Sequence, residues 1–96
     1  MTLNLEAHLL EGIDVFNFLQ LIVSTPKDLA GKSYVLVTKS LLSQLPQSTN
    51  DTIEHCLRHG FVEVKQLGRS NEYWITRKGL EYYHIEDSRG ARFKVS

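Results

Sequence analysis

Apolar and polar positions along the chain follow several periods, and each period predicts a different element. Residues 14–24 are apolar at most positions, begin at Asp14, which can cap a helix, and stop just before Pro26. They therefore predict a first helix. Residues 33–37 are β-branched and aromatic and too few for a helix, so they predict a strand. The pattern of residues 3–11 fits either a helix or an arm.

The middle of the chain predicts two short helices joined by a turn. Thr38 can cap the first of them through its hydroxyl, and Pro46 ends it. Residues 47–51 are small and polar, as in a turn and cap, and the second helix then extends to His59. Gly60 can adopt the left-handed conformation that ends a helix. The residues predicted to face the core are Leu41, Leu42, Leu45, Ile53, Cys56 and Leu57.

A hairpin and a last helix are predicted next. Residues 61–65 alternate in polarity, with Val62 and Val64 on one face; residues 68–71 form a turn and residues 72–75 return as a strand. Thr76 can cap a helix over residues 77–84, with Leu80 and either Tyr82 or Tyr83 facing inward. Residues 85–96 are poor in apolar side chains and are expected to be a mobile tail or an added edge strand.

The first predicted helix carries more apolar side chains than one core-facing stripe requires. They are Val15, Phe16, Phe18, Leu19, Leu21, Ile22 and Val23, which cover most of its circumference. Either this helix is central to the core or one of its faces meets a second subunit.

This order of elements resembles a known fold. The run from residue 37 to residue 83 is similar to the winged-helix domains of bacterial transcription regulators, the broad group that contains the MarR-like and PadR-like proteins. The resemblance rests on Thr38, Leu45, Ser48, Thr49, Arg58, Gly60, Phe61, Val62 and the run Ile75-Thr76-Arg77-Lys78-Gly79. It covers about half of the chain and assigns no particular family.

The resemblance implies an α+β winged helix-turn-helix domain over residues 1–84, in a bacterial or phage transcriptional regulator that binds double-stranded DNA. Residues 38–59 are then the helix-turn-helix and residues 61–75 the wing. The helix at 48–59 enters the major groove while the wing contacts the flanking backbone. The predicted DNA-binding residues are Lys39, Ser48, Thr49, Asn50, Thr52, His55, Arg58, Lys65, Arg69 and Ser70.

The charge balance limits how strongly such a domain can bind DNA. Lys and Arg number 11 and Asp and Glu number 11, so the formal net charge is zero. Residues 1–60 hold four cations and six anions, and residues 61–96 hold seven cations and five anions. Affinity for DNA depends mainly on neutralised phosphates, so a monomer should bind weakly. A homodimer, formed through the first helix, would double the contacts.

Three other interpretations stand beside duplex binding. Asp51 and Glu54 on the second helix of the pair repel phosphate, which favours a winged-helix module that binds a protein instead. His55, Cys56 and His59 have metal-ligand spacing, but zinc needs three or four protein ligands, so no metal or other cofactor is expected. The aromatic residues could stack on nucleotides, but their spacing favours packing: Tyr73, Trp74, Tyr82 and Tyr83.

The remaining features exclude several classes of protein. The chain has no GxSxG, Walker or HExxH motif, so no enzymatic activity is expected. Its longest apolar stretch is too short and too interrupted for a membrane span, and the first residues lack a basic segment typical of a secretory signal. Cys56 is the only cysteine and is interpreted as a buried core residue, consistent with a cytoplasmic protein.

Overall fold

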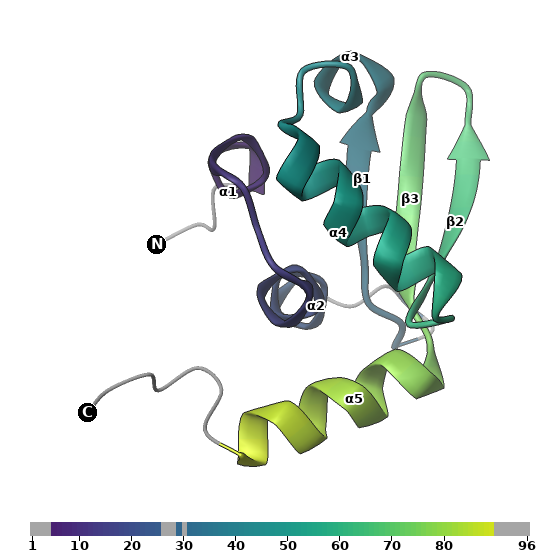
Figure 1. Ribbon diagram of the computed structural model, residues 1–96. Helices are drawn as coiled ribbons and strands as arrows, with labels where there is room; N and C mark the ends of the chain where they lie inside the picture. The colour runs from purple at the N-terminus through teal and green to yellow at the C-terminus, as the bar shows by residue number, and fades with distance from the viewer. Residues whose placement is uncertain (1–4, 26–28, 30, 90–96) are drawn as a thin grey trace.

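Five helices and a three-stranded antiparallel sheet make up the parts of the chain that the structure, a computed structural model, describes: residues 5–25, 29 and 31–89 (Figure 1). This α+β arrangement is compatible with a winged-helix fold. The elements are α1 (Leu5–Glu11), α2 (Val15–Ser24), β1 (Tyr34–Thr38), α3 (Lys39–Leu42), α4 (Gln47–Arg58), β2 (Val62–Leu67), β3 (Ser70–Ile75) and α5 (Arg77–Ser88).

Three helices begin where the sequence predicts a side-chain cap. Asp14 accepts a hydrogen bond from the Asn17 N–H at 2.8 Å, at the start of α2. The hydroxyl of Thr38 does the same for α3, and that of Thr76 accepts from the Gly79 N–H at 3.0 Å for α5. These caps are confirmed, and they follow from local chemistry because the first N–H groups of a helix have no partner within it.

Other element boundaries differ from the prediction. α4 runs from Gln47 to Arg58, close to the predicted helix at 48–59, but its N-cap is Pro46 without a side-chain cap, so residues 47–51, predicted to be turn and cap, are helical. The fixed φ of Pro46 suits the start of a helix, so residues 47–51 can continue it directly without a separate turn. The second hairpin strand begins at Ser70, and α5 continues to Ser88 instead of ending at residue 84. The end of the predicted tail, residues 90–96, lies outside the described residues.

The sheet has an inner and an outer face. β3 lies in the centre, in the order β1-β3-β2, with Val35 and Val64 both opposite Tyr73. Val35, Val37, Val62 and Tyr73 are buried against the helices, while alternate residues such as Leu36 and Lys65 are exposed on the outer face. Val64 is predicted to be buried with Val62 but is 38% exposed, because only the start of β2 is covered.

α2 is the centre of the core. It contacts β1, β3, α4 and α5, and Figure 1 shows these elements along one side of it and below it. Phe18, Leu19 and Ile22 are fully buried, Phe18 meets Tyr73 edge-on at 6.1 Å, and Phe16 stacks on Tyr83 at 5.1 Å. The central position accounts for the apolar circumference of α2. The reason for expecting a dimer through this helix is therefore removed.

The structure also bears on the predictions for α5 and for a membrane span. Tyr83 is the inward tyrosine of α5, whereas Leu80, predicted to face inward, is 36% exposed. None of the helices in the described ranges combines the length and apolar character needed to cross a bilayer.

Candidate nucleic-acid interface

The inner side of α4 contains two residues that the sequence assigned to DNA contact. Thr49 is fully buried and its hydroxyl donates to the Leu9 carbonyl at 2.7 Å. Thr52 is buried as well and donates to the Ile13 carbonyl at 2.6 Å. Neither side chain can reach DNA, so the prediction for both is wrong. With Ile53 they share one helical stripe, and extending the α4 periodicity one turn toward Gln47 would have placed them inside.

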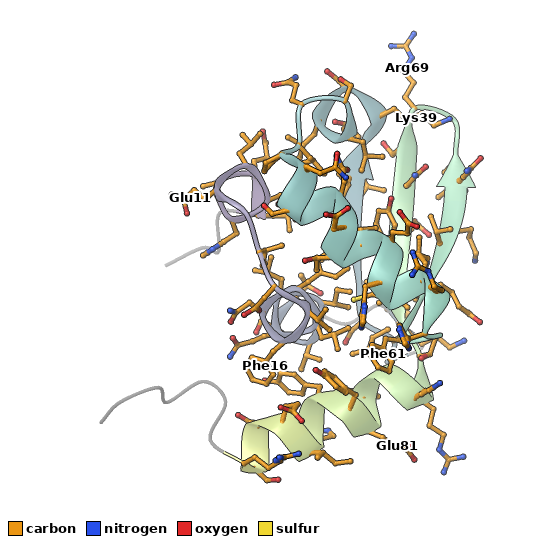
Figure 2. All side chains as sticks on the ribbon, viewed as in Figure 1. Glu11, Phe16, Lys39, Phe61, Arg69 and Glu81 are labelled. Carbon is orange, nitrogen blue, oxygen red and sulfur yellow. The ribbon has the colours of Figure 1, made fainter. Side chains whose placement is uncertain are left out.

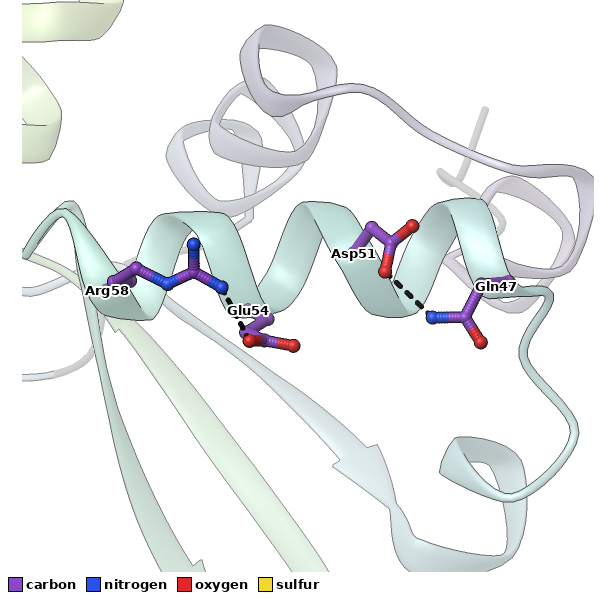
Figure 3. Close-up of polar contacts among 4 residues, drawn as sticks. All are labelled: Gln47, Asp51, Glu54 and Arg58. Carbon is purple, nitrogen blue, oxygen red and sulfur yellow. Dashed lines mark hydrogen bonds and ion pairs between the residues drawn. The ribbon is translucent and has the colours of Figure 1, made fainter.

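The exposed side of α4 is polar, and several of its groups bind one another (Figure 3). The Gln47 amide donates to the Asp51 carboxylate at 2.7 Å, and Arg58 forms an ion pair with Glu54 at 2.6 Å. Arg58 and Glu54 are each about two-thirds exposed, at 67% and 66%. Because Arg58 is paired with Glu54, its charge offsets a carboxylate of the same helix instead of a phosphate. The exposed face of α4 is therefore not positively charged.

Two other polar residues of α4 have separate environments. Ser48 is exposed at the start of the helix. Asn50 is exposed as well, and its side-chain amide donates to the Leu45 carbonyl at 3.3 Å, which ties α4 to the preceding turn. Both side chains can offer hydrogen bonds to a phosphate or a base edge.

A histidine pair lies at the C-terminal end of α4. The rings of His55 and His59 are 4.1 Å apart, and both lie near Phe61. Desolvation, followed by the nearby charges of His55 and Lys78, lowers the pKa of the His59 imidazole below its ordinary value. His59 is therefore less able to add positive charge at neutral pH. Among the described residues, no group of three metal-ligating side chains includes this pair.

Lys39 and Arg69 meet at one end of the molecule although thirty positions separate them in sequence. The backbone N–H of Lys39 donates to the Arg69 carbonyl at 2.8 Å, which joins the start of α3 to the tip of the β2–β3 hairpin. Figure 2 shows both side chains projecting from this end, and both residues are exposed. Ser70, partly buried, lies beside them opposite Thr38. We call Lys39 and Arg69 the tip cations.

Lys65 does not belong with the tip cations. It lies on the outer face of the sheet, directly opposite Glu72, with its ammonium 5.4 Å from the centre of the Trp74 ring. Because side chains alternate along a strand, this face is the one turned away from α4. The structure therefore separates Lys65 from Arg69, which the sequence treats as one pair.

One cation near α4 was not selected from the sequence. Lys78, at the start of α5, has its ammonium 5.9 Å from the Phe61 ring, close to the C-terminal end of α4. The sequence gives no sign of this role for Lys78 beyond its place in the run Thr76-Arg77-Lys78-Gly79. A lysine in the first turn of a helix is expected to be exposed to solvent.

The interior behind this surface contains the single thiol. Cys56 is fully buried on the inner side of α4, and burial raises its pKa to about 12. It is thus a core residue, as the sequence indicates.

Comparison of the chain with protein-family models, with curated proteins and with solved structures gave no match.

Proposed function

We propose that the chain is a winged helix-turn-helix protein that binds double-stranded DNA and regulates transcription. The observation that carries this proposal is the hydrogen bond from the Lys39 N–H to the Arg69 carbonyl. It brings one exposed cation from the start of the helix pair beside another from the tip of the hairpin (Figure 2). Helix-turn-helix proteins use such positions to bind phosphates on either side of the groove that the second helix enters.

In this proposal α4 enters the major groove while the tip cations bind the backbone. Ser48, Asn50 and Arg58 are the α4 side chains that can reach DNA, together with the partly buried His55. Arg58 must first leave Glu54, which is feasible because an exposed ion pair of this kind contributes only about 0.3–0.5 kcal/mol. Thr49 and Thr52 take no part, and Lys65 faces the opposite direction.

A homodimer remains part of the proposal for reasons of charge. The chain as a whole is neutral, and two tip cations per monomer neutralise few phosphates, so a second copy is needed to bind DNA with useful affinity. A dimer of this kind places its two α4 helices about 34 Å apart, one turn of the duplex. The apolar residues of α2 are packed in the core, so they no longer supply a reason for placing the interface at this helix.

The test removes the tip cations and measures binding to a mixed-sequence duplex over a range of salt concentrations. For Lys39→Ala/Arg69→Ala we expect about tenfold weaker binding at low salt, and a salt slope smaller by up to about two, because each phosphate contact releases about one counterion. The matched control is Lys65→Ala/Arg77→Ala, which removes the same charge from the outer face of the sheet and the start of α5. Equal losses in the two variants, or no binding by the unaltered protein at high micromolar concentration, contradict the proposal.

The second candidate function is a winged-helix module that binds a protein and no nucleic acid. It is favoured by the two contacts in Figure 3, because Asp51 and Glu54 engage the donors that DNA would need and present carboxylates on the exposed face of α4. The same duplex titration separates the candidates. The second function is supported if the unaltered protein does not bind the duplex but the variant with both carboxylates neutralised does.

A further inference from the structure

The outer face of the sheet contains a groove that duplex binding by α4 does not use. Its volume is about 620 Å³, within the range of about 300–1,000 Å³ that small-molecule sites occupy. It lies between β2, β3, the start of α5 and the segment before β1. The lining residues that matter for binding are Lys32, Glu63, Lys65, Trp74, Arg77 and Leu80.

Trp74 gives this groove a flat aromatic wall with a fixed orientation. Its ring stacks on Tyr34 of β1 with centres 4.4 Å apart and planes inclined by 22°. Its indole N–H donates to the Glu72 carboxylate at 3.0 Å, which prevents the ring from turning. Stacking surfaces of this kind accept any nucleobase, because every base presents a planar π face.

Lys65 approaches the Trp74 ring from the strand on the other side. Tyr34 belongs to β1 and Lys65 to β2, and both strands pair with β3, where Trp74 lies. The Lys65 ammonium is 5.4 Å from the ring centre, on an exposed and flexible side chain. Such a contact is weak at the surface, so an incoming planar ring can replace the ammonium over Trp74 while the ammonium moves to an anion beside it.

The charge of the groove favours an anionic ligand. Three of its lining residues are cationic, namely Lys32, Lys65 and Arg77, and one is a carboxylate. A second groove, about 900 Å³ and lined by residues of α1, α2, the connection between them and α4, has the opposite character. It is lined by Glu11 and Asp14 and by no lysine or arginine. Of these two grooves among the described residues, the one beside Trp74 is therefore the one suited to phosphate.

We propose that the groove beside Trp74 binds a nucleotide. The base stacks on Trp74, and the phosphate binds Lys65 and Arg77, whose planar guanidinium can form two parallel hydrogen bonds to phosphate oxygens. The same chemistry could be supplied by a free nucleotide or by one unit of a single-stranded nucleic acid. This inference does not depend on the proposed duplex binding, since Lys65 and Trp74 lie on the face of the sheet turned away from α4.

Trp74 also supplies the measurement, because it is the only tryptophan in the chain. We expect AMP to change its fluorescence and to saturate at or below about 1 mM, the weak end of specific binding. Adenosine, which lacks the phosphate, should bind at least tenfold more weakly. A short single-stranded oligothymidylate distinguishes the sources: much tighter binding than AMP indicates a single strand, and equal or weaker binding indicates the free nucleotide.

Paired variants separate this site from the tip cations. Lys65→Ala/Arg77→Ala should weaken AMP binding at least tenfold, whereas Lys39→Ala/Arg69→Ala should leave it unchanged. Both pairs are exposed, and an unaltered circular dichroism spectrum checks their folding; Lys65→Gln/Arg77→Gln replaces the first pair if it folds poorly. The proposal is overturned if AMP leaves Trp74 fluorescence unchanged at millimolar concentration, if adenosine binds as well as AMP, or if both pairs weaken binding equally.

Discussion

At the scale of single residues, the most informative part of the chain is the run from Ile75 to Gly79. Thr76 caps α5, and its hydroxyl also donates to the Gly60 carbonyl at 2.5 Å, while its backbone N–H donates to the Phe61 carbonyl at 2.9 Å. Gly79 is buried against the same place. Thr76 and Gly79 therefore hold α5 against the residues that follow α4, so these two positions of the run have a structural role.

Gly79 has no room for a side chain. A Cβ atom at this position would lie 2.1 Å from the Phe61 carbonyl oxygen, a backbone atom that cannot move independently. We expect Gly79→Ala to lower the free energy of unfolding by about 3 kcal/mol, the upper part of the usual range for overpacking. Urea denaturation measures this loss. Glu81→Ala, exposed on the same helix, should change stability by less than about 0.5 kcal/mol, and an equally small effect of Gly79→Ala contradicts the close approach.

Cys56 should be unreactive in the folded protein. Burial raises its pKa from the ordinary value of 9.0 to about 12, and only the thiolate reacts with thiol reagents. We expect modification at pH 8 to be at least about a hundredfold slower in the native chain than in the chain unfolded by denaturant. Fast modification of the native protein would show that α4 opens readily or that the thiol is accessible.

The raised pKa of the Cys56 thiol makes the free energy of unfolding depend on pH. Because the folded pKa lies above the unfolded one, the contribution of Cys56 is fully present below about pH 9 and is lost as the pH rises toward about 12. The pKa of Tyr82 is also raised, mainly by burial, and acts in the same direction. Comparing urea midpoints of the unaltered protein and Cys56→Ala across this range isolates the thiol: the variant should lose less stability.

At the scale of elements, α4 holds α1 in place. The Leu9 carbonyl belongs to the last turn of α1, where carbonyls have no partner within the helix, and Thr49 supplies that partner. Thr52 does the same for the Ile13 carbonyl, which follows the helix. The two hydroxyls that the sequence indicates for DNA are used instead to dock the N-terminal helix.

Removing the Thr49 hydroxyl should loosen α1. Thr49→Val keeps the shape of the side chain but leaves the Leu9 carbonyl buried without a donor, which costs about 1–3 kcal/mol. We expect a matching fall in urea stability and faster amide hydrogen exchange within Leu5–Glu11. Ser48→Ala, at the exposed neighbouring position, is the control and should do neither. Unchanged exchange in Thr49→Val means that α1 is held by its apolar contacts alone.

At the scale of the whole molecule, the zero net charge is unevenly distributed. The tip cations occupy one end, the groove beside Trp74 gathers cations on the outer sheet face, and the exposed face of α4 carries Asp51 and Glu54. The exposed face of α4 therefore adds little attraction for duplex DNA, and the tip cations must supply it. The affinity for duplex DNA should be set by where the charges lie and not by the net charge of the chain.

Neutralising the α4 carboxylates tests that statement. Asp51→Asn/Glu54→Gln changes the net charge from 0 to +2 and frees Arg58 from its ion pair. We expect duplex binding at low salt to strengthen about fivefold, equivalent to about 1 kcal/mol, with the difference shrinking as salt screens it. Glu63→Gln/Glu72→Gln, on the outer face, is the charge-matched control. A similar gain in the control would mean that total charge governs binding.

How far the sequence predicts this protein depends on the range of the interaction concerned. The caps at Asp14, Thr38 and Thr76 are confirmed because a cap involves residues three positions apart. The sequence predicts too early an end for α5, because Glu86, Asp87 and Ser88 are polar and their helical conformation depends on continuing an existing helix. The candidate site was predicted least well, since exposure on α4 depends on where α1 packs.

By itself, the sequence determined the class of secondary structure and the order of the elements from α2 to α5, because these follow from local periodicity and capping. Only the tertiary structure decided that most apolar side chains of α2 are buried, that Thr49 faces α1, and that Lys39 lies beside Arg69 while Lys65 lies apart. The physical reason is that burial and charge proximity arise between residues distant in sequence. No local pattern contains that information.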